Sequence, residues 1–299
     1  MMSEEVDKVL CCASCGNAEG DDVKLKKCNG CHLVKYCGIE CQKEHRKEHK
    51  RECKKRAAEL RDKILFKQPE SSHHGDCPIC FLPLPIDDRK HFFMVCCGKV
   101  ICVGCDYANK MRQCEGIHLP KCPFCRHPVV TTDEEAARIL MTRVEANDPG
   151  AICQMGFHRN NNCGDCSGAV EYFIKAAELG SINAHYNLSI MYGRGLGVEK
   201  DEKKKLHHLE CSVIGGHVLG RYNLGCAEEE NGRLDRAVKH WIIAANMGDD
   251  LALGNLKIAY RNGLVSKDNF AAALRAHQAA LDATKSPQRE KGEAAVKMF

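Results

Sequence analysis

The residues with the clearest chemistry are cysteines and histidines that stand in close pairs near the start of the chain. Two residues between paired cysteines allow a tight turn to aim both sulfur atoms at one metal ion, and zinc accepts such thiolate and imidazole ligands. His49 and Cys53 stand four residues apart, which places them on one face of a helix. Residues 11–53 hold eight candidate ligands: Cys12, Cys15, Cys28, Cys31, Cys37, Cys41, His49 and Cys53.

We call residues 11–53 the first cysteine unit. Its eight ligands suffice for two tetrahedral sites with no open position, which is typical of structural rather than catalytic zinc. About 42 residues bury too little apolar surface to fold unaided, so zinc must supply the stability. Cys11 is expected to be a bystander, because only Cys12 has the two-residue gap to Cys15. His45 stands one turn before His49 and could replace it as a ligand.

The second cysteine unit, residues 76–130, also holds eight candidate ligands in close pairs. They are Cys77, Cys80, Cys96, Cys97, Cys102, Cys105, Cys122 and Cys125. Because eight ligands again suffice for two closed sites, we expect about four zinc ions per chain. Cys114 and His118 stand in the loop before Cys122 and could compete for the metal.

The placement of the cysteines also bears on the compartment. Seventeen of the 22 cysteines fall between residues 11 and 125, whereas residues 167–299 hold two. The sequence begins without an export signal, and no apolar run approaches the roughly 18 residues of a membrane span. We therefore expect no membrane partner, and reduced, metal-binding thiols in the cytoplasm or nucleus rather than in a secreted protein. The net charge of +4 is too small to indicate nucleic acid.

The first cysteine unit resembles the MYND finger. The order and spacing of all eight ligands match, including the segments 36–42 and 49–53. MYND fingers commonly bind short proline-containing peptides with a glutamine after the sixth ligand and a nearby tryptophan. Gln42 occupies the glutamine position, but Arg46 stands where the tryptophan would be. The resemblance implies interleaved sites, with Cys12, Cys15, Cys37 and Cys41 on one ion and Cys28, Cys31, His49 and Cys53 on the other.

The second cysteine unit resembles a RING domain of the eight-cysteine type. Lys99 stands where a common RING has a histidine ligand, and its ammonium group cannot bind zinc; Cys96 restores the count beside Cys97. The implied sites are Cys77, Cys80, Cys102 and Cys105, and Cys96, Cys97, Cys122 and Cys125. RING domains recruit a ubiquitin-charged conjugating enzyme, and the corresponding contact positions hold Ile79, Pro123, Phe124 and Arg126. Packing between the zinc loops is the alternative role for Ile79 and Phe124.

Helical patterns surround the two cysteine units. A charged helix continues from the first unit until Pro69 ends it, so residues 54–75 are expected to be a helical extension and a flexible linker. The run 43–63 has ten basic and five acidic residues, a pattern usual for a solvated helix face and only occasionally a nucleic-acid surface. The polar residues 285–299 are expected to be a disordered tail.

Residues 133–284, here the repeat region, are alanine-rich and repeat internally. Short motifs at 148–151, 183–188, 220–224 and 252–256 recur at spacings of 33, 36 and 32, which indicates an α-solenoid of helix pairs. The motif Ala-Ala-x-x-Gly ends at Gly180 and at Gly248, and its weaker middle copy is expected to end at Gly215. The segment 192–201, with three glycines, resembles the loop of Sel1-like repeats.

The sequence thus predicts small zinc-stabilised cross-brace domains followed by an all-α solenoid. The expected function is a zinc-binding protein-interaction scaffold. One hypothesis is a RING-type ubiquitin ligase that recruits a charged conjugating enzyme and binds its substrate through the Sel1-like repeats. The alternative is a non-enzymatic adaptor that assembles protein complexes. No nucleophile stands beside a base, so no covalent catalytic residue is expected, and the pair Cys163 and Cys166 is interpreted as incidental.

Overall fold

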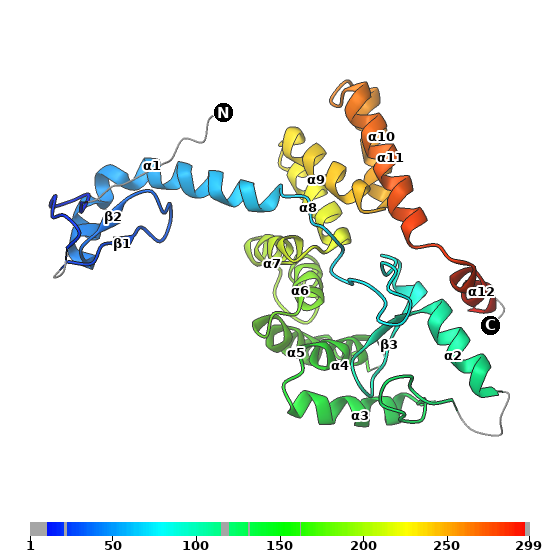
Figure 1. Cartoon of the computed structure of the whole chain (residues 1–299). Helices are drawn as coiled ribbons and strands as arrows, with labels where there is room; N and C mark the ends of the chain where they lie inside the picture. Colours follow the sequence, from blue (N-terminus) through cyan, green and yellow to red (C-terminus); the bar gives the residue numbers. More distant parts are fainter. Residues whose placement is uncertain (1–10, 21–22, 115–119, 131, 162, 297–299) are drawn as a thin grey trace. The chain divides into compact units, whose positions relative to one another are not determined.

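The computed structural model describes residues 11–20, 23–114, 120–130, 132–161 and 163–296. The chain divides into two compact units at Lys67 and Gln68, and each is described by itself (Figure 1). The second cysteine unit therefore belongs to the same compact body as the repeat region, while the first cysteine unit is separate from both.

The first body is built on cysteine loops and one long helix. Strands β1 (Lys26–Lys27) and β2 (Lys35–Tyr36) pair antiparallel, and helix α1 (Ile39–Leu65) follows. The loops have a small core, in which the buried residues are Cys12, Leu25, Cys28, Cys31 and Tyr36. Along α1, charged side chains pair with neighbours three residues away, as Arg56 does with Glu59 at 3.2 Å. The basic run is therefore an exposed, internally paired helix face.

The second body begins with the second cysteine unit. A short 3-10 helix, η1 (Asp88–Lys90), leads into strand β3 (His91–Phe93), which pairs antiparallel with β4 (Val100–Cys102), and α2 (Val103–Cys114) follows directly. The loop between the two strands turns at Gly98, whose φ is 70°. This hairpin places Cys96 and Cys97 at its tip and Cys102 at the end of β4, directly before α2.

The linker before this unit is packed, contrary to the expectation of flexibility. The amide of His73 donates to the carbonyl of Gly216 at 3.2 Å, and the His73 ring stacks on His217 with centroids 4.1 Å apart. Aromatic and backbone contacts with the repeat region therefore order residues that look like an unstructured linker by composition alone.

In its described residues, the repeat region consists of nine helices of similar length that stack in sequence (Figure 1). These are α3 (Asp133–Glu145), α4 (Pro149–Asn161), α5 (Cys166–Glu178), α6 (Ile182–Arg194), α7 (Glu202–Ile214), α8 (Val218–Glu230), α9 (Leu234–Asn246), α10 (Asp250–Arg261) and α11 (Lys267–Ala283). The closest packing joins α4 to α5, α6 to α7 and α8 to α9. Each such pair is one helical hairpin of the solenoid, so the predicted fold class is confirmed.

Small residues recur at the third position of the hairpins' first helices. Ala151, Ala184 and Ala252 are fully buried there. Gly220 is the counterpart in α8, and a Cβ atom on it would lie 2.5 Å from the hydroxyl of Ser212. The repeated small residue is thus required by the close approach of the neighbouring helix.

The glycine that ends the middle motif is Gly216, not Gly215. Gly180, Gly216 and Gly248 all have φ near 90°, while Gly215 has φ −75°. The expected alignment was therefore one residue out of register. Ser212 and Val213, both fully buried, take the places of the paired alanines, and Cys211 does not. Only a glycine adopts this left-handed conformation without strain, which fixes the register.

The described part of the segment after the repeat region, residues 285–296, is ordered, contrary to the expectation of a disordered tail, and residues 297–299 lie outside the described residues. Residues Pro287–Val296 form α12, which packs against α2 of the second cysteine unit. The helices touch through glycines: a Cβ atom on Gly292 would lie 2.7 Å from the carbonyl oxygen of Val103, and one on Gly104 would lie 2.6 Å from Cα of Arg289. The polar composition of this segment is typical of disorder and gives no sign of the contact. The contact depends on the fit of Gly292 against the backbone of α2, which the composition does not reveal.

The structure also bears on a membrane location. Among the described residues, no helix combines the length and the apolar character needed to cross a membrane.

Candidate metal centres

Both cysteine units are made of the same local turn. In each, the amide of the residue after a close cysteine pair donates back to the carbonyl of the first cysteine, as Phe81 does to Cys77 at 2.8 Å and Arg126 to Cys122 at 3.1 Å. That residue has a positive φ at Gly16, His32, Phe81 and Arg126. The turn directs both sulfur atoms to one side, so the local sequence alone builds half of each site.

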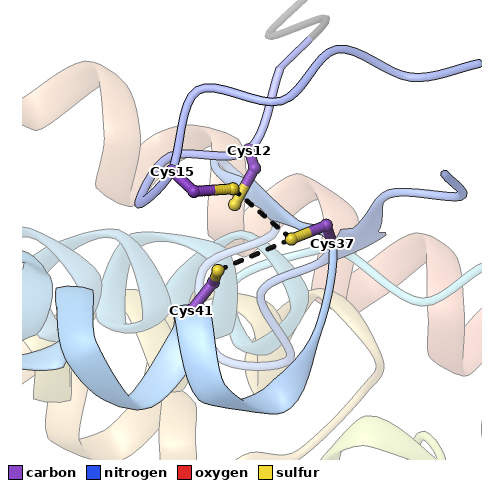
Figure 2. Close-up of side chains that lie close together, drawn as sticks. All are labelled: Cys12, Cys15, Cys37 and Cys41. Atoms are coloured by element: carbon purple, nitrogen blue, oxygen red, sulfur yellow. Dashed lines mark hydrogen bonds between the residues drawn. The ribbon is translucent and has the colours of Figure 1, made fainter.

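The turns assemble into four clusters, each with one ligand atom per residue and all atoms within 4.8 Å of one another. We name each cluster by its first residue. They are the Cys12 cluster (Cys12, Cys15, Cys37, Cys41), the Cys28 cluster (Cys28, Cys31, His49, Cys53), the Cys77 cluster (Cys77, Cys80, Cys102, Cys105) and the Cys96 cluster (Cys96, Cys97, Cys122, Cys125). Figure 2 shows the four sulfur atoms of the first cluster pointing toward a common centre. Within each unit, the two clusters alternate along the chain.

The spacing of the sulfur atoms fits zinc. One Sγ–Sγ distance from each cluster can be compared with zinc geometry. It is 3.6 Å in the Cys12 cluster, 3.7 Å in the Cys28 cluster, 3.8 Å in the Cys77 cluster and 3.6 Å in the Cys96 cluster. Four thiolates that surround zinc at about 2.3 Å stand about 3.8 Å apart, as the corners of a tetrahedron. None of the described cysteines forms a disulfide. Four clusters with this geometry confirm the prediction of about four zinc sites.

Without the metal charge, the surroundings shift the cysteines of one cluster in opposite directions: the pKa of Cys28 is lowered, whereas burial raises the pKa of Cys53 to about 11. Burial opposes ionisation of Cys28, but the amides of Cys31 and Gly30 donate to its sulfur and lower its pKa to about 6. In Cys77, a hydrogen bond from Cys102 is the main cause that lowers the pKa to about 4. One cysteine of each of these two clusters is therefore the thiol that ionises most readily, and hydrogen bonds from its neighbours are the cause.

The structure separates the alternative ligands of the first cysteine unit. Nε2 of His49 lies 3.1 Å from Sγ of Cys31, and the ring is buried. Nδ1 of His45 instead lies 3.1 Å from the hydroxyl of Tyr36, and its ring stacks on that of His49. Cys11 is exposed and belongs to none of the four clusters.

In the second cysteine unit, Cys96 and Cys97 both enter one cluster, and Lys99 points to solvent as an exposed residue. Of the two competing candidates, His118 lies outside the described residues. The backbone of Cys114 ends α2, and its side chain is also outside the described part. The candidate contact residues differ in exposure: Phe124 and Arg126 are exposed, Pro123 is half-buried, and Ile79 packs against the small core of the unit.

Sequence reasoning missed two residues that contact the Cys77 cluster from α12. Arg289 is 2% exposed, and its guanidinium donates to Sγ of Cys80 at 3.3 Å and to the carbonyls of Leu82, Pro83 and Thr284. Gln288 donates to Sγ of Cys105 at 3.5 Å. Burial alone would disfavour the charge of Arg289, but the sulfur atoms of Cys80 and Cys102 outweigh burial and raise its pKa. Such donors around metal-binding thiolates hold the ligands in place.

We expect Arg289→Ala to destabilise the second body by about 3–5 kcal/mol, because three carbonyls and a thiolate lose their buried donor at once. Urea unfolding followed by far-ultraviolet circular dichroism measures the loss. Arg275→Ala is the matched control, since Arg275 is exposed on α11. A midpoint for Arg289→Ala equal to that of the control would contradict this role.

Two cross-braced cysteine units and a stack of helical hairpins define a zinc-finger protein with an α-solenoid. Comparison with known families agrees. Residues 12–53 match the MYND finger, and residues 164–181, 182–217 and 219–249 match the Sel1 repeat. The predictions of a MYND finger and of Sel1 repeats are therefore confirmed. Neither family covers the second cysteine unit. No curated protein matches this sequence.

The solved structures that are similar to this chain include the following two. One is a Sel1 repeat protein from Oxalobacter formigenes, with 25% identity, a TM-score of 0.45, and coverage of 51% of this chain and 65% of that one. The other is a protective antigen of uropathogenic Escherichia coli strains that displays an SLR fold. It has 21% identity, a TM-score of 0.42, and coverage of 57% and 37%. The chain thus spans less than two thirds of either relative.

Proposed function

We propose that this protein is a RING-type ubiquitin ligase in which the second cysteine unit recruits a ubiquitin-charged conjugating enzyme and the Sel1 repeats hold the substrate. The observation that carries the proposal is the second pair of alternating four-cysteine clusters, followed directly by an exposed arginine. In this proposal the domains are 11–53, 76–130 and 133–284, and the sixteen cluster residues are the zinc ligands. The ions organise the fold and do no chemistry, because no cluster has an open position.

The surface of the second cysteine unit suits such a contact. Phe124 is 38% exposed between the last two cysteines, which leaves an apolar ring available to a partner. Arg126 is exposed, and within the described part of the chain no hydrogen bond or ion pair engages its guanidinium. Ile79 packs partly on the core of the unit, so it would serve both the fold and the contact. A free guanidinium beside an apolar ring can bridge an enzyme and its bound ubiquitin.

The second candidate is a non-enzymatic adaptor. A groove of about 510 Å³ lies on the first cysteine unit and is lined by Ile39, Gln42 and Arg46 among others. Ile39 is 70% exposed there, so its apolar side chain is available to a partner. The groove favours peptide binding by this unit whether or not the second unit is active. Both candidates share a protein-interaction role, and we place both in the cytoplasm or nucleus.

Discharge of preloaded conjugating enzymes onto free lysine distinguishes the two candidates. We expect the wild type to accelerate discharge from at least one member of a panel, and Ile79→Ala to lower both binding and discharge about tenfold, since it removes apolar contact area. Ile258→Ala is the matched control, because Ile258 is an exposed isoleucine on α10. If the zinc-loaded wild type accelerates discharge from no enzyme, the ligase proposal is wrong and the adaptor remains.

A further inference from the structure

A group of histidines lies outside the cysteine clusters, where the segment before the second cysteine unit meets the repeat region. His73 and His74 come from this segment, His91 begins β3, and His217 caps α8. They line one cavity of about 680 Å³ together with Asp88. The sequence pattern did not single out any of them as a ligand.

Three of these residues have the geometry of a metal site. One ligand atom each of His74, Asp88 and His91 lies within 4.8 Å of the other two. Nε2 of His91 lies 3.3 Å from Nδ1 of His74 and 3.7 Å from Oδ1 of Asp88. Nε2 of His74 lies 3.6 Å from the same oxygen. His91 thus presents Nε2 both to the carboxylate and to His74, whereas His74 presents Nε2 to the carboxylate and Nδ1 to His91.

These distances match zinc with nitrogen and oxygen ligands. At bond lengths of about 2.0 Å, the corners of a tetrahedron stand about 3.3 Å apart, closer than the sulfur atoms of the cysteine clusters. The two distances from the Nε2 atoms of His74 and His91 to Oδ1 of Asp88, 3.6 and 3.7 Å, are near this spacing. The 3.3 Å contact between the rings involves the other nitrogen of His74 and belongs to a different set of ligand atoms. Two histidines and one carboxylate are also a recognised ligand set for divalent transition metals.

The surroundings orient the rings for this purpose. Nδ1 of His91 lies 3.2 Å from the carbonyl oxygen of Asp88; as a donor to it, Nδ1 holds the proton and leaves a lone pair on Nε2. The side chains of His74 and His91 are 9% and 8% exposed, whereas that of Asp88 is 79% exposed. Burial is also the main cause that lowers the pKa of both rings, so they are neutral, as metal ligands must be.

We propose that His74, Asp88 and His91 form a fifth metal site, which takes zinc or a similar divalent transition ion. The site differs in kind from the four cysteine clusters, since three protein ligands leave a coordination position for water on the side of the cavity. The proposal is independent of the ligase proposal, because neither depends on the activity of the other.

The fifth site would fasten the second cysteine unit to the repeat region. His74 follows His73, whose ring stacks on His217 and whose amide donates to Gly216. A metal ion that joins His74 to η1 and β3 would hold the segment with His73 and His74 in place between the second cysteine unit and the repeat region. The ion therefore has a structural role across a junction, in addition to any chemistry of its open position.

Native mass spectrometry of the full chain, saturated with Zn²⁺ and then freed of loosely bound ions, tests the proposal. We expect five ions in the wild type and four in both Asp88→Asn and His91→Ala. Asp88→Asn is the more informative variant, because this exposed side chain can change without loss of the fold. Asp87→Asn and His208→Ala are matched controls and should keep five ions. Asp87 pairs with Arg89, and His208 lies 2.9 Å from His185 with no carboxylate in the group.

Addition of Co²⁺ to the protein that holds four zinc ions gives a second readout. Binding at the fifth site should produce weak visible bands without the intense sulfur-to-metal absorption of thiolate sites, and these bands should be absent in Asp88→Asn. Four ions in the saturated wild type would overturn the proposal. So would five ions in both Asp88→Asn and His91→Ala, since the fifth ion would then lie elsewhere.

Discussion

Removal of zinc by a strong chelator at neutral pH is expected to unfold residues 12–53 completely and to leave most of the helical signal of residues 133–283. Among the described residues of the first unit, only Leu25 and Tyr36 are buried apart from the cluster ligands. Structural zinc contributes about 10 kcal/mol or more to such small domains, which they cannot replace. The repeat region instead has its own apolar core, with Phe173, Leu188 and Leu256 fully buried.

Hydrogen exchange read by mass spectrometry resolves the two parts in one experiment. Amides of residues 23–53 should exchange at the rate of an unfolded chain after chelation, and amides of α5 to α9 should stay protected. Addition of Zn²⁺ should restore the protection of the first cysteine unit. Loss of protection in α5 to α9 at the same chelator concentration would contradict the independence of the repeat region, in which each hairpin depends on its neighbours.

Arg126→Ala is expected to slow ubiquitin discharge about 10²-fold while zinc content, fold and binding of the conjugating enzyme stay unchanged. The guanidinium lies outside every cluster, so its loss removes no ligand. Under the ligase proposal, the variant loses the orientation of the reacting thioester. Misplacement of a reacting group by about 1 Å can slow a reaction by about 10²-fold. Discharge onto free lysine at saturating protein measures the orientation step apart from recruitment.

Arg126→Lys should restore only part of the activity, because an ammonium group cannot make the forked contact of a guanidinium. Lysine keeps the charge, so the variant distinguishes geometry from electrostatics. Arg138→Ala serves as the control, since the Arg138 side chain is 76% exposed on α3. Equal discharge by the wild type and Arg126→Ala would reject the role assigned to this arginine, even if the protein proves to be a ligase.

The cysteine clusters could be predicted from the sequence because each is assembled from local turns. The gap between paired cysteines fixes the turn, and the amide of the next residue closes it, as in Phe81 and Arg126. The choice between His45 and His49 is less local. It depends on which turn of α1 meets Cys31, and the structure places His49 there.

The contacts that the sequence did not predict all join distant segments. Arg289 meets Cys80 only because α12 returns to the second cysteine unit, and no local pattern marks it. The same holds for the proposed fifth site, whose histidines come from a linker and from a strand. The prediction that Gly215 ends the middle motif was wrong for another reason. Gly215 and Gly216 are adjacent, and only the backbone angle φ distinguishes them.

The contact between α12 and the Cys77 cluster also sets an order of events during synthesis. Arg289 stands 209 residues after Cys80, whose sulfur it contacts. At about 5–20 residues per second, a ribosome needs roughly 10–40 s to cover that distance. The second cysteine unit therefore emerges and can bind metal long before its last donor exists. A nascent chain that stops within the repeat region would carry the second cysteine unit without the donors of α12, and this form would lose its metal more easily. The unit is complete only when α12 has left the exit tunnel of the ribosome.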